Sequence, residues 1–579
     1  MRRSFRAIAV DYDGTITEGG RPEQRLLDTL QTARACGLRV VLVTGRILVE
    51  LELEFPDVRS FFDALVVENG AVVVREGAAY PLASPIGFEL DEALLHRGVV
   101  FRRGQVVLAT HAPYEAAVLE EIRRLGLELA IVGNRGERLV LPVGVSKGIG
   151  LLDALAGLDL SPHSAVAIGD AENDHSLLEA CELGVAVGNA VPALKQHADL
   201  VLPLPNGKGV LDFLVSQVLP GTTLPPPPRR AIPLGRSPDG APVGIVAAHQ
   251  DLLITGASGS GKSYLAGALA ERLLQRQYTI CALDLEGDHL HLDRFANVTR
   301  LGGHHAAPPF GSQLDAVLRG GSSAVVDLSL LGPEEREREV GELLEVLARQ
   351  RRDSGLPHWV LVEEAHVAFP EGRVSDAVLS ALRGGLCLVS YRPEALARTV
   401  VEGLDAAVVA AGGSRVEESH VEGFVAGAFG VDEARFRETL ETLEIGHALL
   451  VRRQPQAAVE AFAVGSRGSL HVRHWHKYAY SDLPPAQRFY FRTGARTTGV
   501  AAPNLSEFHR ALETASEEVL RHHATHRDFS RWIRDVVGDA KLAADLRGLE
   551  AQLTSSAPGA AMETVRRAVL DAIETRYLE

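Results

Sequence analysis

Two aspartates separated by a single residue follow the first apolar run of the chain. Asp11 and Asp13 stand in DYDGT, directly after AIAV. Such a run predicts a buried strand, and the end of a parallel strand presents both carboxylates at the edge of the sheet where ligands bind. Covalent phosphoryl transfer needs one carboxylate as nucleophile and a second carboxyl group that protonates the leaving oxygen and later deprotonates water. The pair therefore suits phosphate-ester chemistry.

Further polar groups follow apolar runs in the same part of the chain. Thr44 closes VVLV, where a hydroxyl and backbone N–H groups can hold a phosphate. Lys147, in GVSKGIGLL, can neutralise developing negative charge. Asp170 and Asp174, in AVAIGDAENDHSLL, are hard oxygen ligands of the kind that Mg²⁺ prefers. Lysine is scarce in this Arg-rich chain, which favours a specific role for Lys147.

This ordered set of motifs resembles the haloacid dehalogenase (HAD) phosphatase superfamily over about residues 5–215. VVENGAVV, with Glu68 and Asn69, and GDAENDHSLL are similar to the branch that includes the Cof-type sugar phosphatases, sucrose-phosphate phosphatase and archaeal phosphoglycolate phosphatase. Members of that branch carry a small α+β cap between the second and third motifs. The resemblance therefore implies a cap at about residues 78–145.

The resemblance also implies a role for each residue. Asp11 is the expected nucleophile and Asp13 the expected general acid/base, while Thr44 and Lys147 are expected to bind the phosphate. The implied Mg²⁺ ligands are Asp11, Asp13, Asp170 and Asp174. Asn173 is expected to support the site.

A glycine-rich loop opens the second region. GASGSGKS follows LLIT and precedes the helical pattern SYLAGALAERLLQ, which is the Walker A arrangement in its required context. Glycines let backbone N–H groups wrap the phosphates, Lys262 reaches the terminal phosphates, and Ser263 coordinates Mg²⁺. The predicted ATP-binding residues are Gly256, Gly259, Gly261, Lys262 and Ser263.

Two later strands indicate which P-loop chemistry follows. HWVLVEEAHVAF predicts a strand that ends in Glu363 and Glu364, and CLVSYRPEAL predicts another that ends in Ser390. With an acidic turn after ICALD, these features resemble the HerA–FtsK branch of ATPases over about residues 230–450. The resemblance implies that Glu363 assists Mg²⁺, that Glu364 polarises the attacking water, and that the chain forms a ring-shaped homo-oligomer. Glu363 and Tyr391 depart from the usual Asp and Gln of that pattern.

The elements that must position these residues predict an α/β chain of several parts. Strand and helix patterns alternate over residues 1–218, as in a Rossmann-like parallel sheet, with the cap inserted. Four consecutive prolines predict a stiff linker at 219–230. A P-loop α/β domain is expected over 231–465, opening with a hairpin that turns at Asp239-Gly240. A small, mainly helical domain is expected over 466–579.

Composition sets outer limits on the function. A chain of 579 residues, at about 150 residues per domain, predicts three or four domains. The net charge of −16 gives no indication of nucleic-acid binding, and no apolar run approaches the roughly 18 residues of a membrane helix. The cysteines are scattered and form neither a zinc motif nor a disulfide framework, so a cytoplasmic location is expected.

Histidines gather in the last part of the chain. They are His471, His474, His476, His522, His523 and His526. Tetrahedral metal sites usually combine fixed spacings with cysteine or acidic partners, and no such frame is visible. A solvated surface of histidine, arginine and aromatic residues is therefore favoured over a transition-metal site, and a regulatory or assembly role is expected for this domain.

The leading hypothesis is an Mg²⁺-dependent phosphomonoesterase that acts on a small metabolite, such as a sugar phosphate or phosphoglycolate, and is fused to an ATP-hydrolysing domain. The alternative is a nucleic-acid-processing protein, either a HerA-like DNA motor or a polynucleotide phosphatase/kinase. The predicted Walker B glutamates favour water activation over kinase chemistry. DNA-stimulated ATP hydrolysis would indicate the motor, and phosphate transfer to a 5′-hydroxyl end would indicate the kinase.

Overall fold

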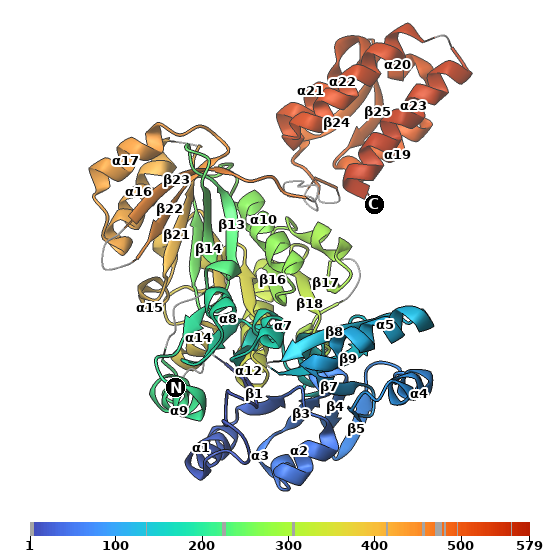
Figure 1. The fold of residues 1–579 in the computed structure, drawn as a ribbon. Coiled ribbons are helices and arrows are strands. Elements are labelled where there is room, and N and C mark those ends of the chain that lie inside the picture. The colour runs from blue at the N-terminus through green and yellow to red at the C-terminus, as the bar shows by residue number, and fades with distance from the viewer. Residues whose placement is uncertain are drawn as a thin grey trace. The chain divides into compact units, whose positions relative to one another are not determined.

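A computed structural model describes residues 5–134, 136–222, 227–303, 307–412, 415–453, 458–468, 478–479, 482–494, 496–556 and 558–578. The chain divides into two compact units (Figure 1). The first comprises Met1–Ile232, Ile245–His249 and Gln350–Leu356, and the second comprises Pro233–Gly244, Gln250–Arg349 and Pro357–Glu579. No helix among the described residues has the length and apolar character needed to cross a membrane.

The first unit is built on an eight-stranded sheet of order β12-β11-β10-β1-β2-β3-β4-β5. The strands from β12 to β3 are parallel, and β4 and β5 are antiparallel. Its strands are β1 (Ala7–Asp11), β2 (Arg39–Val43), β3 (Ala64–Val67), β4 (Val72–Arg75), β5 (Ala78–Pro81), β10 (Ala165–Gly169), β11 (Leu183–Ala186) and β12 (Leu200–Val201). Its helices are α1 (Gln24–Ala35), α2 (Leu48–Glu54), α3 (Val58–Phe61), α6 (Lys147–Gly157), α7 (His175–Ala180), α8 (Pro192–His197) and α9 (Asn206–Phe213).

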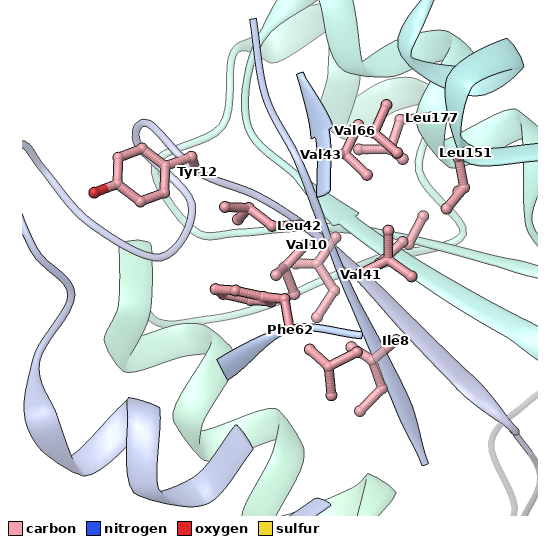
Figure 2. Close-up of a cluster of buried hydrophobic side chains, with 14 of the residues drawn as sticks. Ile8, Val10, Tyr12, Val41, Leu42, Val43, Phe62, Val66, Leu151 and Leu177 are labelled. Atoms are coloured by element: carbon pink, nitrogen blue, oxygen red, sulfur yellow. The ribbon is translucent and has the colours of Figure 1, made fainter. Parts of the chain in front are cut away.

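The central strands are apolar on both faces, which is why they read as continuous hydrophobic runs. Figure 2 shows this core, with Ile8 and Val10 of β1 beside Val41 and Val43 of β2. These side chains have no exposed area, and each contributes roughly 1.5–3 kcal/mol through burial. The core therefore holds the carboxyl ends of β1 and β2 rigidly.

The cap is a second, four-stranded antiparallel sheet of order β6-β7-β9-β8 within the first unit. Its elements are α4 (Phe88–His96), β6 (Phe101–Arg103), β7 (Leu108–His111), α5 (Glu115–Leu125), β8 (Leu129–Asn134) and β9 (Glu137–Pro142). Leu108, Ile122 and Val140 form a small core with the cap helices, whereas Ala109 and Leu139 belong to the main core of the unit. The cap sheet is thus apolar on both faces, and one of them packs on the parallel sheet.

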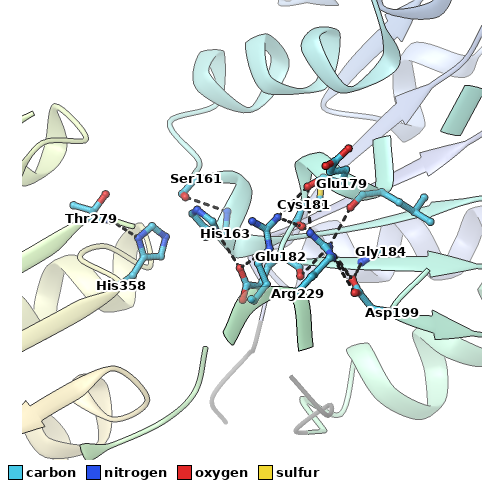
Figure 3. A network of polar contacts seen from close by, with 12 residues as sticks. Ser161, His163, Glu179, Cys181, Glu182, Gly184, Asp199, Arg229, Thr279 and His358 are labelled. Carbon is cyan, nitrogen blue, oxygen red and sulfur yellow. Dashed lines mark hydrogen bonds and ion pairs between the residues drawn. The ribbon is translucent and has the colours of Figure 1, made fainter. Parts of the chain in front are cut away.

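The segment Pro228–Arg230, at the end of the proline-rich stretch, is hydrogen-bonded to the rest of the first unit. The guanidinium of Arg229 donates to the Asp199 carboxylate at 2.8 Å and to the carbonyl oxygen of Cys181 at 2.9 Å (Figure 3). Arg230 donates to the carbonyl oxygen of Cys181 at 2.6 Å. The end of the proline-rich stretch is therefore anchored by arginines that satisfy buried backbone carbonyls.

An eleven-stranded sheet of order β14-β13-β23-β22-β21-β15-β20-β19-β16-β18-β17 belongs to the second unit, except for the first residues of β13 and the last residues of β14. Its strands are β13 (Ala231–Arg236), β14 (Pro242–Val246), β15 (Leu252–Thr255), β16 (Ile280–Asp284), β17 (Val298–Gly302), β18 (Ser323–Asp327), β19 (Trp359–Val362), β20 (Leu386–Ser390), β21 (Ala406–Ala410), β22 (His447–Arg452) and β23 (Ala458–Val464). Its helices are α10 (Lys262–Gln275), α11 (Gly311–Arg319), α12 (Pro333–Asp353), α13 (Ala365–Ala368), α14 (Asp376–Leu382), α15 (Arg398–Glu402), α16 (Arg415–Phe429) and α17 (Glu433–Glu441). Strand β20 lies between β15 and β19, so one strand separates the Walker A strand from the Walker B strand.

The last part of the chain is mainly helical, as predicted. It consists of β24 (Phe489–Thr493), β25 (Arg496–Ala502), α19 (Leu505–Thr514), α20 (Glu517–His526), α21 (Asp528–Trp532), α22 (Ala540–Ser555) and α23 (Ala560–Ile573). Phe489 lies at the centre of an aromatic cluster with Phe508, Phe529 and Trp532, at centroid distances of 4.9–5.6 Å. The fold class predicted from the sequence, a capped Rossmann-like sheet followed by a P-loop domain and a small helical domain, is confirmed.

Candidate functional site

The motifs of the first unit meet because their strands are neighbours. Asp11 ends β1 opposite Val43 of β2, which places Thr44 at the same edge. Strand β10 flanks β1 on the other side and ends one residue before Asp170. Helix α6 begins at Lys147, after Ser146, whose hydroxyl caps it by accepting the N–H of Ile149. Each predicted residue is therefore placed by the end of a buried element.

Lys147 joins the first and last of these motifs. Its ammonium lies 2.7 Å from Oδ1 of Asp11 and 2.6 Å from Oδ1 of Asp174. The Lys147 residue is 1% exposed and Asp174 is fully buried. The second Asp174 oxygen accepts the backbone N–H groups of Asp170 and Ala171, both at 2.9 Å. Asp174 is thus held on both oxygens, and it fixes the lysine in turn.

Burial and neighbouring charge change the acidity of this pair. Loss of hydration and the nearby Asp174 charge raise the pKa of Asp11 well above its ordinary value, although Lys147 opposes this shift. Burial acts to lower the pKa of Lys147, but the charges of Asp11 and Asp174 outweigh it and raise that pKa. Lys147 is therefore a permanent positive charge at the site.

Three buried carboxylates could hold a metal ion. Asp11, Asp170 and Asp174 offer ligand oxygens that all lie within 4.8 Å of one another. The hydroxyl of Thr15 donates to Oδ1 of Asp170 at 3.2 Å. Lys147 pairs with two of these groups, Asp11 and Asp174, so among the described ion pairs the acidic groups of the site outnumber its lysine. A divalent cation with hard oxygen ligands, such as Mg²⁺, fits both the donor set and the charge.

Asp13 lies outside that group and has a different partner. Its two carboxylate oxygens each accept from the Arg46 guanidinium at 2.7 Å. Arg46 also pairs with Glu54, and its guanidinium lies 5.0 Å from the centre of the Tyr12 ring. Sequence reasoning missed Arg46 and Glu54. The available signal was an arginine directly after the Thr44-Gly45 strand end, in a chain where arginine is too common to stand out.

Thr44 and Asn173 are held in place by the loop after β3. Thr44 is 1% exposed, and its hydroxyl accepts the N–H of Arg46 at 3.2 Å. The backbone N–H of Asn69 donates to the Thr44 carbonyl at 3.0 Å, and the Asn173 side chain donates to Oδ1 of Asn69 at 3.0 Å. Asn69 therefore links the threonine motif to the acidic motif.

The glycine-rich loop of the second unit has the geometry of a phosphate cradle. Gly256, Gly259 and Gly261 have positive φ angles of 144°, 83° and 97°. A Cβ on Gly256 would lie 2.7 Å from the carbonyl oxygen of Ala410, so only glycine fits there. Lys262 begins α10, and its ammonium donates to the Ala257 carbonyl at 2.8 Å. The lysine side chain thus folds back over the loop that is predicted to hold the phosphates of ATP.

The two Walker B glutamates point to different partners. Glu363 is buried, and its Oε1 lies 2.6 Å from Nε2 of His289. The carboxylate of Asp284 presents His289 by accepting its backbone N–H at 2.8 Å. Glu364, in contrast, has a left-handed φ of 46°. Sequence reasoning missed His289, because its proximity to Glu363 arises only when β16 and β19 pair.

Glu364 lies near His366, whose ring contacts Ser390 at the end of β20. Its Oε2 lies 3.3 Å from Nδ1 of His366, and that nitrogen lies 3.1 Å from the hydroxyl oxygen of Ser390. The Ser390 oxygen also accepts the N–H of Arg392 at 3.0 Å. Burial and the charge of Arg392 lower the pKa of His366. His366 therefore lies beside both the predicted catalytic glutamate and Ser390 at the end of β20.

The histidines of the last domain divide into two groups. His471, His474 and His476 lie outside the described residues. His522, His523 and Asp528 present ligand atoms within 4.8 Å of one another. However, Nε2 of His523 accepts the backbone N–H of Arg492 at 2.8 Å, so its proton is on Nδ1, which lies 2.8 Å from Asp528. Both nitrogens of His523 thus serve the fold.

The comparisons with known proteins divide the chain in the same two regions. A family model of haloacid dehalogenase-like hydrolases matches residues 8–89 and 106–214. A model of the central domain of the helicase HerA matches residues 237–345.

Several relatives match the first region over nearly their whole length. Phosphoglycolate phosphatase 2 of Saccharolobus solfataricus is 32% identical over 220 residues, which cover 36% of this chain and 90% of that protein. The phosphoglycolate phosphatase of Methanopyrus kandleri is 31% identical over 226 residues, which cover 36% of this chain and 94% of that protein. A solved structure described as a HAD subclass IIB sugar phosphatase is 22% identical, covers 34% of this chain and 93% of its own, and has a TM-score of 0.29.

The fold and the strand-end motifs define a capped α/β phosphatase joined to an α/β domain that carries a P-loop and matches the central domain of HerA. The chain belongs to the haloacid dehalogenase-like hydrolases.

Proposed function

We propose that this protein is an Mg²⁺-dependent phosphomonoesterase that acts on a small phosphorylated metabolite through an aspartyl-phosphate. Asp11 is the nucleophile and Asp13 the general acid/base. Thr44 and Lys147 bind the phosphoryl group. The proposed Mg²⁺ ligands are Asp11, Asp170 and Asp174. Asp13 is proposed as a further Mg²⁺ ligand, although its carboxylate oxygens both accept hydrogen bonds from Arg46.

The observation that carries this proposal is the enclosure of the carboxylates. Asp11, Asp170 and Asp174 are at most 3% exposed, and the cap sheet packs into the same hydrophobic cluster as the strands that bear them. A site closed in this way admits a small ester and excludes bulk water, whereas the end of a polynucleotide needs an open groove. Phosphoglycolate is the first candidate, because it is the substrate that the relatives are named for.

The proposed reaction has two steps, transfer of the phosphoryl group to Asp11 and hydrolysis of the aspartyl-phosphate. The Asp11 carboxylate attacks phosphorus, the bond to the ester oxygen breaks, and Asp13 gives that oxygen a proton. Water then attacks the aspartyl-phosphate, Asp13 takes a proton from the water, and inorganic phosphate leaves. Bound Mg²⁺ supplies positive charge that offsets the repulsion between the nucleophile and the phosphate. Lys147 adds a fixed positive charge beside Asp11 and Asp174.

Phosphate release from a panel of small esters by the purified full chain tests this proposal. The panel contains 2-phosphoglycolate, hexose phosphates and p-nitrophenyl phosphate, with and without Mg²⁺, and Asp11→Asn is the blank. We expect release that needs Mg²⁺ and is lost in the variant. Release that persists in Asp11→Asn would refute the assigned nucleophile.

The second unit is proposed to bind and hydrolyse ATP. Strand β20 lies between the Walker A and Walker B strands, and it brings Ser390 to the His366 ring that contacts Glu364. This arrangement presents a carboxylate for activating water, which is the chemistry of an ATPase and not of a kinase. Glu363 is proposed as the carboxylate on the Mg²⁺ side, together with Ser263.

A DNA motor is the second candidate function, and the match to the HerA central domain favours it. ATP hydrolysis by the full chain, with and without single- and double-stranded DNA, distinguishes the two candidates, with Lys262→Ala as the blank. Hydrolysis that is indifferent to DNA supports the metabolic role. Strong stimulation by DNA would make the phosphatase an accessory of a nucleic-acid machine.

A further inference from the structure

Three consecutive residues between β3 and β4 adopt a backbone conformation that is unusual for two of them. Glu68, Asn69 and Gly70 have φ angles of 54°, 56° and 97°. Left-handed conformations cost a non-glycine residue of order 1–3 kcal/mol and persist where the surrounding structure demands them. Both Glu68 and Asn69 are nearly fully buried. The contacts of this tripeptide show which interactions stabilise the left-handed conformation.

The backbone of the tripeptide touches the loops that carry the catalytic motifs. The N–H of Glu68 donates to the Arg46 carbonyl at 2.9 Å, in the loop after β2. A Cβ on Gly70 would lie 1.9 Å from the carbonyl oxygen of Ser146, immediately before Lys147. Only glycine therefore lets the start of α6 approach so closely. With the Asn69 contacts to Thr44 and Asn173, the tripeptide reaches three of the four motifs.

The side chain of Glu68 points instead to the cap. Its carboxylate accepts the backbone N–H groups of Gln105 at 2.7 Å, Val106 at 2.8 Å and Val107 at 3.1 Å. These residues form the turn between β6 and β7 of the cap sheet. A Cβ on Gly104 would lie 2.5 Å from the Glu68 carboxylate, so the turn is shaped to receive that group. Glu68 is 1% exposed.

We propose that Glu68 is the positioning residue that fixes the cap over the phosphate site. Its carboxylate holds the 104–107 turn, and its backbone N–H holds the loop after β2 at Arg46. Its neighbours Asn69 and Gly70 contact Thr44, Asn173 and the start of α6. Glu68 thus ties the cap turn to the tripeptide whose other two residues contact the catalytic motifs. This inference rests on the proposed phosphatase function, because the cap excludes water from that reaction. Glu68 itself touches no reacting group, so its effect is indirect.

The charge of Glu68 matters for this role. A carboxylate offers only acceptors to three converging N–H groups, and hydrogen bonds to an ionised acceptor are about twice as strong as neutral ones. Glutamine has nearly the same shape, but it offers a neutral oxygen and turns an NH₂ donor toward a backbone donor. Glu68→Gln therefore weakens the docking of the turn without opening a cavity.

Amide hydrogen exchange of the full chain, without substrate, tests the contact itself. In Glu68→Gln we expect the amides of residues 105–107 to exchange at least about tenfold faster, while those of β9 keep their rates. The control is Glu121→Gln, which removes a buried cap carboxylate whose ion-pair partners, Arg97 and Arg124, are not residues of the turn. Unchanged exchange at 105–107 in Glu68→Gln would overturn the proposal.

Steady-state kinetics then test the positioning role. With 2-phosphoglycolate, or the best ester of the panel, we expect Glu68→Gln to raise KM by about tenfold and to lower kcat by less. Glu121→Gln is expected to keep both constants even if its melting temperature falls. Faster exchange with unchanged KM and kcat would overturn the positioning role. A wild-type protein without phosphatase activity would instead refute the proposed function, and the exchange result would still decide whether Glu68 holds the turn.

Discussion

The Arg46 guanidinium binds both carboxylate oxygens of Asp13, each at 2.7 Å. Arg46 is itself held by Glu54 of α2 and by the face of Tyr12. A planar guanidinium that makes two parallel hydrogen bonds fixes the orientation of a carboxylate, which a lysine cannot do. The proposed general acid is therefore oriented by residues of the neighbouring strand-end loop.

Replacing Arg46 by lysine is expected to impair proton transfer more than binding. General acid catalysis contributes about 10²–10⁴-fold, so kcat for an alkyl phosphate should fall by at least about tenfold in Arg46→Lys. The loss should be much smaller for p-nitrophenyl phosphate, whose leaving group needs little protonation. Arg34→Lys, which alters a partly exposed pair with Asp63, is the control. Equal losses for both substrates would contradict a role through Asp13.

Lys147 is expected to be needed for both stability and activity. Lys147→Met leaves the buried carboxylates of Asp11 and Asp174 without their ammonium partner, and removal of one member of a buried ion pair typically costs about 3–5 kcal/mol. We expect a lower melting temperature, loss of phosphatase activity, and a larger stabilisation by added Mg²⁺ than in the wild type. Thermal denaturation with and without Mg²⁺ measures this difference. An Mg²⁺ effect no larger than that of the wild type would argue against a cation at these carboxylates.

The two proposed activities are expected to be separable. Asp11→Asn should reduce phosphate release from small esters by several orders of magnitude and leave ATP hydrolysis intact. Lys262→Ala should have the opposite effect, because each residue lies in the site of its own unit. Both activities are measured on the same preparations of the full chain. Loss of both in either variant would show that the sites depend on each other.

The strand-end motifs could be predicted because each stands directly after an uninterrupted apolar run. In a parallel sheet such runs end at one edge, so Asp11, Thr44 and Asp170 are predicted to lie together. Lys147 begins a helix, and its place in the site came from the family resemblance. The same logic located the Walker A loop and the two glutamates after β19. The hydrophobic periodicity and the ends of the predicted strands therefore predict most of the fold and the positions of most candidate residues.

Partners that depend on the packing of distant elements could not be predicted. The hold of Arg46 on Asp13 needs the register of β1 and β2, and the hydrogen bond between His289 and Glu363 needs β16 beside β19. The role of Glu68 could not be read from the sequence. Its carboxylate binds backbone N–H groups, which nearly every residue type has, so no particular residue marks its partners. Its partners appear only when the cap turn meets the sheet.

The last domain is expected to lose stability in mild acid because of His523. Burial lowers the pKa of His523 below its ordinary value of 6.5, despite the neighbouring Asp528. The neutral ring accepts the N–H of Arg492 on Nε2, and protonation of that nitrogen removes the acceptor. Since the unfolded state binds this proton more readily than the folded state, the stability contribution is complete above pH 6.5 and is lost as the pH falls through the lower, folded-state pKa.

Hydrogen exchange of α20 and β24 between pH 7.5 and pH 5 in the full chain measures this loss, after correction for the intrinsic pH dependence of exchange. The protection of both elements should fall with pH in the wild type. His523→Gln cannot be protonated, so its protection should be lower at pH 7.5 and nearly independent of pH. His522→Gln, whose ring lies beside His523 at 5.1 Å, is the matched control and should keep the wild-type slope. Added Zn²⁺ should not protect these elements, because both nitrogens of His523 are already engaged; strong protection by Zn²⁺ would instead indicate a metal site at His522, His523 and Asp528.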